Sequence, residues 1–379
     1  MEFTWVVKGR KKLTTKEKIL SSGEDLFSKY WYETVSIAQV CRNAKVSNGI
    51  FYKYYLKKED LFKELLNRTL NIFDEEIKNI SGKSQSQRLK SFLNTVVSIG
   101  TENRNLITIF REGQYRFPEF ENKLEAIYKD AINKIYDYKI TDAMYFFIMS
   151  GIRFISIRSM YNNREINIKT VQKIIEHGIF KDILSRRDII FSNKLLIKRS
   201  ITEPDTKTKL LNSAIALFGK NGFHNVNVYE ISKNANLSVG SFYIHFKSKA
   251  ICLEEIVELI GIRTRNFISS NLSGDLNRLD QELRGMHLFL EYFKQDSNYY
   301  RIVRQSEFVV NKAATNYYNC FEKGYLKNLR NLRVNDKTTV ANFLMGISHY
   351  LGIEVFFTGK IKNTKKFILE LSEYLQNGI

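Results

Sequence analysis

The chain has 379 residues, of which 44% are hydrophobic and 13% aromatic, with only 2 prolines and 19 glycines. This length exceeds one ordinary hydrophobic core and predicts at least two domains, and the few breakers favour long helices over a turn-rich β fold. The formal net charge of +19 points to a polyanionic partner, nucleic acid rather than a membrane, although genomic base bias towards lysine and asparagine would give the same surplus.

The cysteines and the apolar segments of the chain indicate the cellular compartment in which the protein is expected. Cys41, Cys252 and Cys320 show no CxxC spacing, which favours a reducing compartment and argues against a disulfide framework or a zinc site. The N-terminus places its apolar residues before its charges, unlike a secretory signal, and the dense apolar run Met144–Met149 is far too short to cross a membrane. We therefore expect a cytoplasmic, nucleoid-associated protein without a membrane partner.

The first half of the chain is expected to begin with a basic arm at residues 1–14. Apolar spacing then predicts a helix from Thr15 to about Lys29, and Ser36 with Gln39 forms the capping box of the next helix. A turn at Lys45 leads to a short helix over 48–54, which Ser47 can cap. Further helices are predicted at 58–80, 88–100, 105–115, 119–138, 142–160 and 170–185.

The second half repeats the first. Residues 36–61 and 227–252 align without a gap, so that Gly49 matches Gly240 and Tyr52 matches Tyr243 at one constant offset. Asn227 and Glu230 repeat the capping box. An internal repeat of this length indicates two copies of one helical unit. Helices are predicted at 208–220, 249–270, 279–294, 298–311, 313–332, 337–357 and 361–377.

Both copies carry the same family pattern. The first copy shows it at Ser36, Ile37, Val40, Cys41, Ala44, Val46, Ser47, Gly49, Phe51, Tyr52, Tyr54, Tyr55, Lys58 and Leu61; the second at Asn227, Val228, Ile231, Ser232, Ala235, Leu237, Ser238, Gly240, Phe242, Tyr243, His245, Phe246, Ser248 and Lys249. This pattern resembles the DNA-binding domain of the tetracycline-repressor (TetR) family of transcriptional regulators. The resemblance implies an all-α chain of two tandem units, each a helix-turn-helix domain followed by a helical ligand-binding and dimerisation bundle.

The repeat and the resemblance together predict five segments. Residues 1–60 and 206–251 are expected to be the two DNA-binding domains, 61–185 and 252–379 the two regulatory domains, and 186–205 the linker between the units.

A helix-turn-helix lays its second helix in the major groove of double-stranded DNA, with its N-terminal residues near base edges. The residues expected to contact DNA are Ser36, Ser47, Asn48, Gly49, Ile50, Tyr52, Lys53, Tyr54 and Lys58 in the first copy, and Asn227, Ser238, Val239, Gly240, Ser241, Tyr243, His245 and Lys249, with Ile244 further along, in the second. The resemblance implies that the tyrosines reach phosphate. A lysine at a helix start suits phosphate as well.

The residues expected near base edges differ between the two copies. This difference predicts two unlike half-sites and a non-palindromic operator.

The motif glycines, Gly49 and Gly240, have two possible roles. They would permit close approach to DNA, and tight packing inside the protein is the alternative. In the first copy, Lys45, Trp31 and Lys57 replace a turn glycine, a helix-ending glycine and a capping serine, which predicts some strain; in the second copy Asn236 takes the turn.

The resemblance also implies an inducer pocket and a four-helix dimer interface. We expect helices 142–160 and 170–185 to pair with 337–357 and 361–377 inside one chain, giving a monomeric pseudo-dimer that acts as a ligand-released repressor; a homodimer with four heads is the alternative. Candidate pocket residues, each with core packing as its alternative role, are Phe110, Tyr115, Phe117, Phe146, Met149 and Phe154, or Phe308, Tyr317, Phe343 and Tyr350. They would suit an apolar or aromatic small molecule; no cofactor or metal is implied.

Enzyme motifs are missing from the sequence. The five histidines show no HExxH spacing, and GxSxG, P-loop and GxGxxG patterns do not occur. We therefore expect a regulator that is not an enzyme. A helical interaction scaffold, in which one helix-turn-helix no longer binds DNA, is the other candidate class, and the repeated Tyr52/Lys58 and Tyr243/Lys249 sets argue against it.

Overall fold

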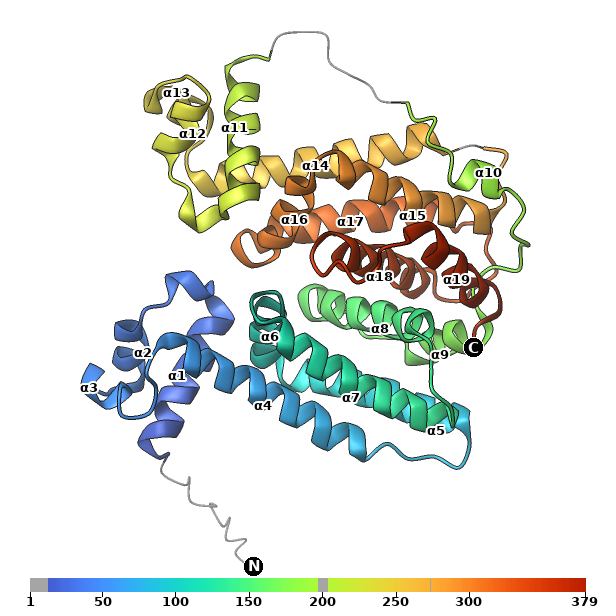
Figure 1. Ribbon diagram of the computed structural model, residues 1–379, viewed down its shortest axis with the longest axis horizontal. Helices are drawn as coiled ribbons and strands as arrows, with labels where there is room; N and C mark the ends of the chain where they lie inside the picture. Colours follow the sequence, from blue (N-terminus) through green and yellow to red (C-terminus); the bar gives the residue numbers. More distant parts are fainter. Residues whose placement is uncertain (1–12, 197–203, 273) are drawn as a thin grey trace, which may run out of the picture. The chain divides into compact units, whose positions relative to one another are not determined.

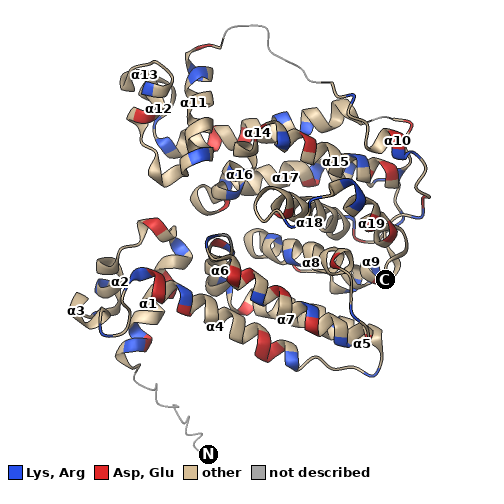
Figure 2. Cartoon of the chain, viewed as in Figure 1, with Lys and Arg blue, Asp and Glu red and all other residues tan. Residues whose placement is uncertain are grey.

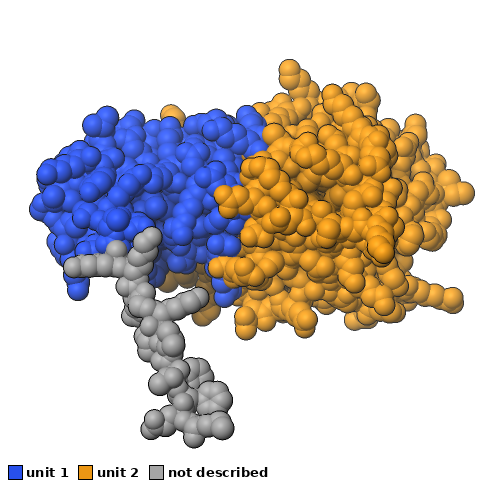
Figure 3. Space-filling model, turned by 90° about the horizontal axis from the view of Figure 1, so that it is seen from below, with its two compact units in different colours: residues 1–72, 103–123 blue, residues 73–102, 124–379 orange. Residues whose placement is uncertain are grey.

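The structure is a computed structural model that describes residues 13–196, 204–272 and 274–379. These residues form α-helices and two short 3-10 helices without any strand, so the predicted all-α fold is confirmed. The predicted basic arm lies outside the described residues, except for Leu13 and Thr14. The chain forms two compact units, Met1–Ile72 with Asn103–Lys123, and Phe73–Glu102 with Leu124–Ile379 (Figure 3). The predicted domain boundaries follow the repeat instead and stay predictions.

The first unit contains the first helix-turn-helix. Its elements are α1 (Thr15–Lys29), the 3-10 helix η1 (Tyr32–Thr34), α2 (Ile37–Ala44), α3 (Asn48–Phe51), most of α4 (Lys58–Lys78), α6 (Arg104–Arg116) and the start of α7 (Pro118–Tyr136). Phe27, Leu61 and Phe62 are buried in its core. A Cβ on Gly23 would lie 2.9 Å from the side chain of Leu61, so the glycine lets α1 pass close to α4.

The second unit contains the remainder of the chain. Its elements that precede the second copy are the C-terminal parts of α4 and α7, together with α5 (Gln85–Glu102), α8 (Asp142–Asn162), α9 (Ile168–His177) and α10 (Arg187–Ile190). The second copy adds α11 (Thr206–Asn221), the 3-10 helix η2 (Phe223–Asn225), α12 (Val228–Asn234), α13 (Val239–His245), α14 (Lys249–Asn271), α15 (Arg278–Gln295), α16 (Ser297–Val309), α17 (Asn311–Asn328), α18 (Lys337–Phe356) and α19 (Thr364–Asn377).

The helix predicted over 170–185 is too long. Helix α9 ends at His177 because Gly178 takes a left-handed φ of 69°. The backbone N–H groups of Ile179 and Phe180 then donate to the carbonyl of Leu375 on α19. Gly178 is therefore a local stop signal that the prediction overlooked, and the contact with α19 holds the chain beyond it.

Helices α8, α9, α18 and α19 pack together within the second unit (Figure 1). Both α8 and α18 are buried over most of their surface, as an apolar helix surrounded by others must be. A Cβ on Gly151 would lie 2.3 Å from the ring of Phe343, and one on Gly346 would lie 2.6 Å from the carbonyl oxygen of Ser150. The two helices therefore meet at glycines, where their backbones come close.

A buried ion pair adds polar specificity beside this contact. The guanidinium of Arg158 on α8 donates to Glu322 on α17 at 2.9 Å and to Asn342 on α18 at 3.3 Å. The side chains of Arg158 and Glu322 are 6% and 8% exposed. Burial by itself would raise the pKa of Glu322, but the hydrogen bonds from Arg164, Arg158 and Asn342 outweigh it and hold that pKa below its usual value.

The start of the predicted linker is anchored to α15. Arg284 donates to the carbonyl oxygens of Ile190 and Ser192 at 3.0 and 2.6 Å. Residues 197–203 of the linker lie outside the described residues. No helix in the described part of the chain has the length and apolarity needed to cross a membrane.

Candidate nucleic-acid interface and effector cavity

Each helix-turn-helix begins with a capping box. The Ser36 side chain accepts from the N–H of Gln39, and the Gln39 side chain accepts from the N–H of Ser36 at 2.7 Å. Asn227 and Glu230 make the same reciprocal pair at the start of α12. Both predicted capping boxes are confirmed. Ser36 and Asn227 are exposed, so their predicted DNA contact stays a prediction.

The turn between the two helices uses a left-handed residue in both copies. Lys45 has φ 57° and Asn236 has φ 56°. Asparagine tolerates this region, whereas a lysine there costs on the order of 1 kcal/mol. The strain expected at Lys45 is therefore present in the backbone. Trp31 is different, because its φ is −59° whereas its counterpart Gly222 has a left-handed φ of 82°. In the first copy, the chain therefore leaves α1 and enters η1 without a left-handed residue at Trp31.

The second helix of each helix-turn-helix, α3 or α13, is called its reading helix below. Each reading helix packs against its own domain on one side only. Phe51 and Phe242 are fully buried at equivalent positions. A buried hydrogen bond from Ser22 to the carbonyl of Val40, 2.8 Å, fixes α1 to α2, and Ser213 repeats it with Ile231 at 2.7 Å. These contacts leave the opposite side of each reading helix free to meet another molecule.

The motif glycines have no packing partner. The nearest atom to a Cβ built on Gly49 is the Ser47 Oγ at 3.9 Å, and on Gly240 it is the Ser238 Oγ at 3.6 Å. Neither glycine has a left-handed φ. An alanine would therefore fit at both positions, although glycine weakens a helix. Nothing within the described residues explains these glycines.

Two tyrosines stand out from the reading helices. Tyr52 and Tyr243 are 54% and 56% exposed. Their rings rest edge-on against Phe51 and Phe242 at 5.6 and 5.5 Å. Each ring is thereby supported by a core residue while more than half of the tyrosine's surface stays exposed, which suits a phosphate contact.

The other residues predicted to contact DNA differ in how far they are exposed to solvent. Ser47, Asn48, Lys53, Tyr54, Ser238 and Val239 are exposed, whereas Ile50, Ser241 and His245 are half-buried. Helix α3 ends at Phe51, earlier than the predicted 54, whereas α13 continues to His245. Ser238 caps α13 through the N–H of Ser241, but Ser47 makes no such cap, contrary to expectation. The first reading helix is therefore the less regular one.

The lysines at the starts of α4 and α14 are already engaged within the protein. The Lys58 ammonium donates to the carbonyl oxygens of Tyr32 and Val35 at 2.6 and 2.8 Å, and Lys249 donates to those of Phe223 and Val226 at 2.7 and 2.5 Å. Burial lowers the pKa of both lysines. The sequence predicts phosphate contact for them, and the structure adds an intramolecular role that closes the loop before each motif.

Sequence reasoning missed the residues that hold this loop from the other side. The N–H of Tyr32 donates to Glu112 on α6 at 3.0 Å, and the N–H of Phe223 donates to Gln305 on α16 at 2.9 Å. These partners lie about eighty residues away in the chain, so no local pattern could have indicated them. They connect each reading head to the helix behind it.

The two heads also differ in charge. Residues 36–58 hold five basic and no acidic residues, whereas 227–249 hold three basic and one acidic. Figure 2 marks these residues, which include the exposed Arg42 and Lys53 in the first head and Lys233 in the second. Both heads are electropositive, as binding to phosphate requires, and the first is more so.

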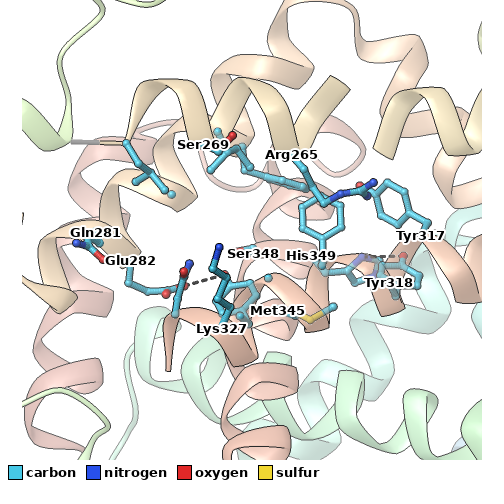
Figure 4. Close-up of a pocket in the computed structure, with 18 of the residues that line it drawn as sticks. Arg265, Ser269, Gln281, Glu282, Tyr317, Tyr318, Lys327, Met345, Ser348 and His349 are labelled. Atoms are coloured by element: carbon cyan, nitrogen blue, oxygen red, sulfur yellow. Dashed lines mark hydrogen bonds between the residues drawn. The ribbon is translucent and has the colours of Figure 1, made fainter. Parts of the chain in front are cut away.

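A cavity of about 290 Å³ lies in the second unit. Helices α14 to α18 form its walls, and Phe154 reaches in from α8. Figure 4 shows Glu282 on one side and Arg265, Tyr317 and the pair Tyr318–His349 on the other. Most of its surface is aromatic or aliphatic, with a few polar groups, which is the usual composition of a small-molecule site.

Two of the predicted pocket residues line this cavity, namely Phe154 and Tyr317. Phe146, Met149, Phe308, Phe343 and Tyr350 belong to the same unit but do not line it, and Phe110 and Phe117 belong to the other unit. Phe343 and Phe146 pack against Phe147 and Phe367, respectively. The side chain of Tyr115 lies outside the described residues.

Two acidic or phenolic groups of the cavity wall, Glu282 and Tyr318, are hydrogen-bonded within the protein. Glu282 is buried, receives hydrogen bonds from Tyr325 at 2.8 Å and Arg278 at 3.0 Å, and has its pKa raised by burial. Tyr318 donates to Glu307 on α16 at 2.6 Å and lies 3.3 Å from the His349 ring. The cavity wall is thus directly bonded to α16, the helix that carries Gln305.

Known proteins share these motifs. The family model described as bacterial regulatory proteins, tetR family, matches residues 19–65 and again 210–256. The HTH-type transcriptional regulator QacR of Staphylococcus aureus is 30% identical over 131 residues, which cover 33% of this chain and 70% of QacR. The HTH-type transcriptional regulator HbdR of Aromatoleum is 37% identical over 62 residues, 16% of this chain and 27% of HbdR. The fatty acid degradation regulator FadR of Bacillus halodurans is 13% identical in its solved structure, with a TM-score of 0.42 over 47% of this chain and 98% of FadR.

Proposed function

The chain belongs to the tetR family of bacterial regulatory proteins, and from this premise we propose that it is a ligand-responsive repressor whose two unlike heads read one asymmetric DNA site. Membership supports regulation of transcription by a DNA-binding helix-turn-helix. The repressor activity, the effector and the single-chain arrangement are the added parts of the proposal.

The packing of α8 and α9 against α18 and α19 carries the single-chain arrangement. In the family, two such helix pairs from two subunits form the dimer interface, whereas here one chain supplies both pairs. The close approach at Gly151 and Gly346 and the buried pair Arg158–Glu322 give this contact the tight packing of a protein core. A second chain would have no equivalent helices left to pair with.

Mass in solution tests the arrangement directly. The proposal expects a 44.5 kDa species in free solution and, when DNA is added, a complex of one chain with one duplex. A predominant species of twice that mass at working concentrations would instead support a homodimer with four heads.

The operator is expected to be asymmetric. Asn48 and Lys53 in the first head stand where Val239 and Ile244 stand in the second, and side chains of different chemistry select different base edges. Selection from a random DNA library by the purified chain should enrich a non-palindromic sequence. Enrichment of a perfect palindrome would refute the asymmetric reading, and no enrichment at any salt concentration would refute DNA recognition itself.

The cavity between α14 and α18 is the proposed effector site. Its aromatic lining and volume suit an apolar or aromatic small molecule. Binding there would reach the second head through α16, because Glu307 on this helix bonds to Tyr318 in the cavity wall and Gln305 on the same helix holds Phe223. A ligand that moves Tyr318 would bias the balance between DNA-competent and incompetent states.

Effector and repression are tested together. A panel of apolar and aromatic compounds would be screened for stabilisation of the purified chain, and each hit tested for release of the selected duplex. A hit should release wild-type protein but release the Gln305→Ala variant less well. In cells, deletion of the gene should raise transcription next to the selected site; a fall in transcription would indicate an activator.

A further inference from the structure

Helix α13 leaves a large apolar side chain in solvent on its reading face. Ile244 is 81% exposed, and Val239 at the start of the helix is 37% exposed. Phe242 is fully buried and anchors the opposite side of the helix. Ile244 therefore contributes almost nothing to the core, although burial of isoleucine is strongly favourable.

Gly240 lies one turn before Ile244 on the same face. Residues four apart in a helix stack along one side, and a Cβ on Gly240 would have no neighbour closer than 3.6 Å. This face consequently has a gap at Gly240, where DNA can approach closely, followed by the branched side chain of Ile244. At the aligned positions the first head has Gly49 and then Lys53, which follows the end of α3 at Phe51, so an ammonium replaces the aliphatic group.

An aliphatic side chain in the major groove has one favourable partner. Among the four bases, only thymine exposes a methyl group there, whereas guanine, adenine and cytosine present hydrogen-bonding groups that isoleucine would desolvate without compensation. Lysine in the same place suits the O6 and N7 acceptors of guanine. The difference between the copies therefore corresponds to a difference in the base that each head prefers.

We infer that Ile244 is a specificity-determining residue that packs on the C5 methyl group of a thymine in the half-site of the second head. Lys53 occupies the equivalent place in the first half-site and selects guanine. This inference rests on the proposed function, since it requires both heads to bind one duplex.

Removal of single methyl groups from the DNA tests the contact. With the full chain and its selected duplex, each thymine is replaced in turn by deoxyuridine, which lacks only the C5 methyl. One such replacement should weaken binding roughly fivefold, the order expected for one buried methyl group. In the Ile244→Ala variant, which changes an exposed side chain and should fold normally, the same replacement should have no effect.

A residue exchange assigns the half-sites and provides the matched control. Selection with Ile244→Lys should change only one half of the enriched sequence, with guanine replacing thymine at the methyl-sensitive position. Lys53→Ala should keep the methyl response in full. The inference would be overturned if no replacement of thymine by deoxyuridine weakened binding, or if the same replacement still weakened binding by the Ile244→Ala variant. Either result would leave DNA recognition itself intact. Failure of the chain to bind any duplex would instead overturn the proposed function.

Discussion

The backbone N–H of Tyr32 donates a 3.0 Å hydrogen bond to the carboxylate of Glu112, a residue with only 6% of its surface exposed. The second copy makes the same contact with a neutral acceptor, Gln305. Both contacts fix the residue that follows the first helix of a reading head. The two heads are therefore joined to the helix behind them by the same hydrogen bond, but only the first uses an acceptor that can ionise.

This difference predicts a pH dependence that belongs to the first head. Burial raises the pKa of Glu112 to about 8, against the opposing influence of the Tyr32 N–H and the nearby Arg116 and Lys58; Glu33 reinforces the rise. The folded state thus binds this proton more tightly than the unfolded chain, whose carboxyl has a pKa near 4.5. The free energy of unfolding should therefore fall as the pH rises from about 4.5 to about 8.

Urea unfolding of the full chain at several pH values checks this. Glu112→Gln should remove most of the fall, because glutamine keeps the acceptor and loses the charge. The reciprocal variant Gln305→Glu should add a smaller fall to the second copy, because residue 305 is only half-buried. An unchanged slope in Glu112→Gln would show that other groups control the pH dependence.

Lys45→Gly should stabilise the protein. Lys45 holds φ 57°, and relief of a left-handed non-glycine residue is worth about 1 kcal/mol in the free energy of unfolding. Asn236→Gly is the matched control, for which a smaller gain is expected because asparagine tolerates this region. Equal gains at both positions in urea unfolding would contradict the idea that the first turn is the more strained.

Gly240→Ala should separate stability from DNA binding. The new methyl group meets no close neighbour, so the free energy of unfolding should rise by about 0.5–1 kcal/mol. Affinity for the selected duplex should nevertheless fall at least tenfold, or about 1.4 kcal/mol, because the methyl group blocks close approach. Gly324 on α17 lines the cavity, and a Cβ there would have no neighbour within 4 Å. In the absence of effector, Gly324→Ala should stabilise without loss of affinity, as a DNA titration would reveal.

Lys249→Met should destabilise the second head. The carbonyl oxygens of Phe223 and Val226 would lose the ammonium that now donates to both, at a cost of about 2–3 kcal/mol. Lys58→Met should have a similar effect in the first head. The exposed Lys247 is the control, since Lys247→Met should alter thermal unfolding little. If Lys249→Met unfolded like wild type but bound DNA weakly, phosphate contact would be its main role.

Arg158→Met should weaken the contact between the two halves of the chain. It leaves the buried Glu322 with only Arg164 as a charged partner, which should cost about 3 kcal/mol of the free energy of unfolding. Adding Glu322→Met removes the remaining buried carboxylate and should recover most of that loss. A double variant as unstable as the single one would show that packing around Arg158, and not charge, is responsible.

Local patterns in the sequence were sufficient for the helices and for the motif that reads DNA. The capping boxes Ser36–Gln39 and Asn227–Glu230, and most helix bounds, depend on interactions within one or two turns, so the residues concerned are neighbours in the chain. The repeat then identified both heads at once. At Gly178 the predicted helix was too long, because the glycine ends α9 with a φ of 69° and backbone contacts with α19 hold the residues that follow.

The tertiary structure decided what the motif residues do. Lys58 and Lys249 look like phosphate ligands in the sequence, yet their ammonium groups close a loop that begins more than twenty residues earlier. Gly49 and Gly240 could have been packing glycines, and only the open space around them removes that reading. Hydrogen bonds and packing between residues far apart in the chain leave no periodic trace in the sequence, which is why the sequence alone determined the two reading heads but not the contacts that hold them.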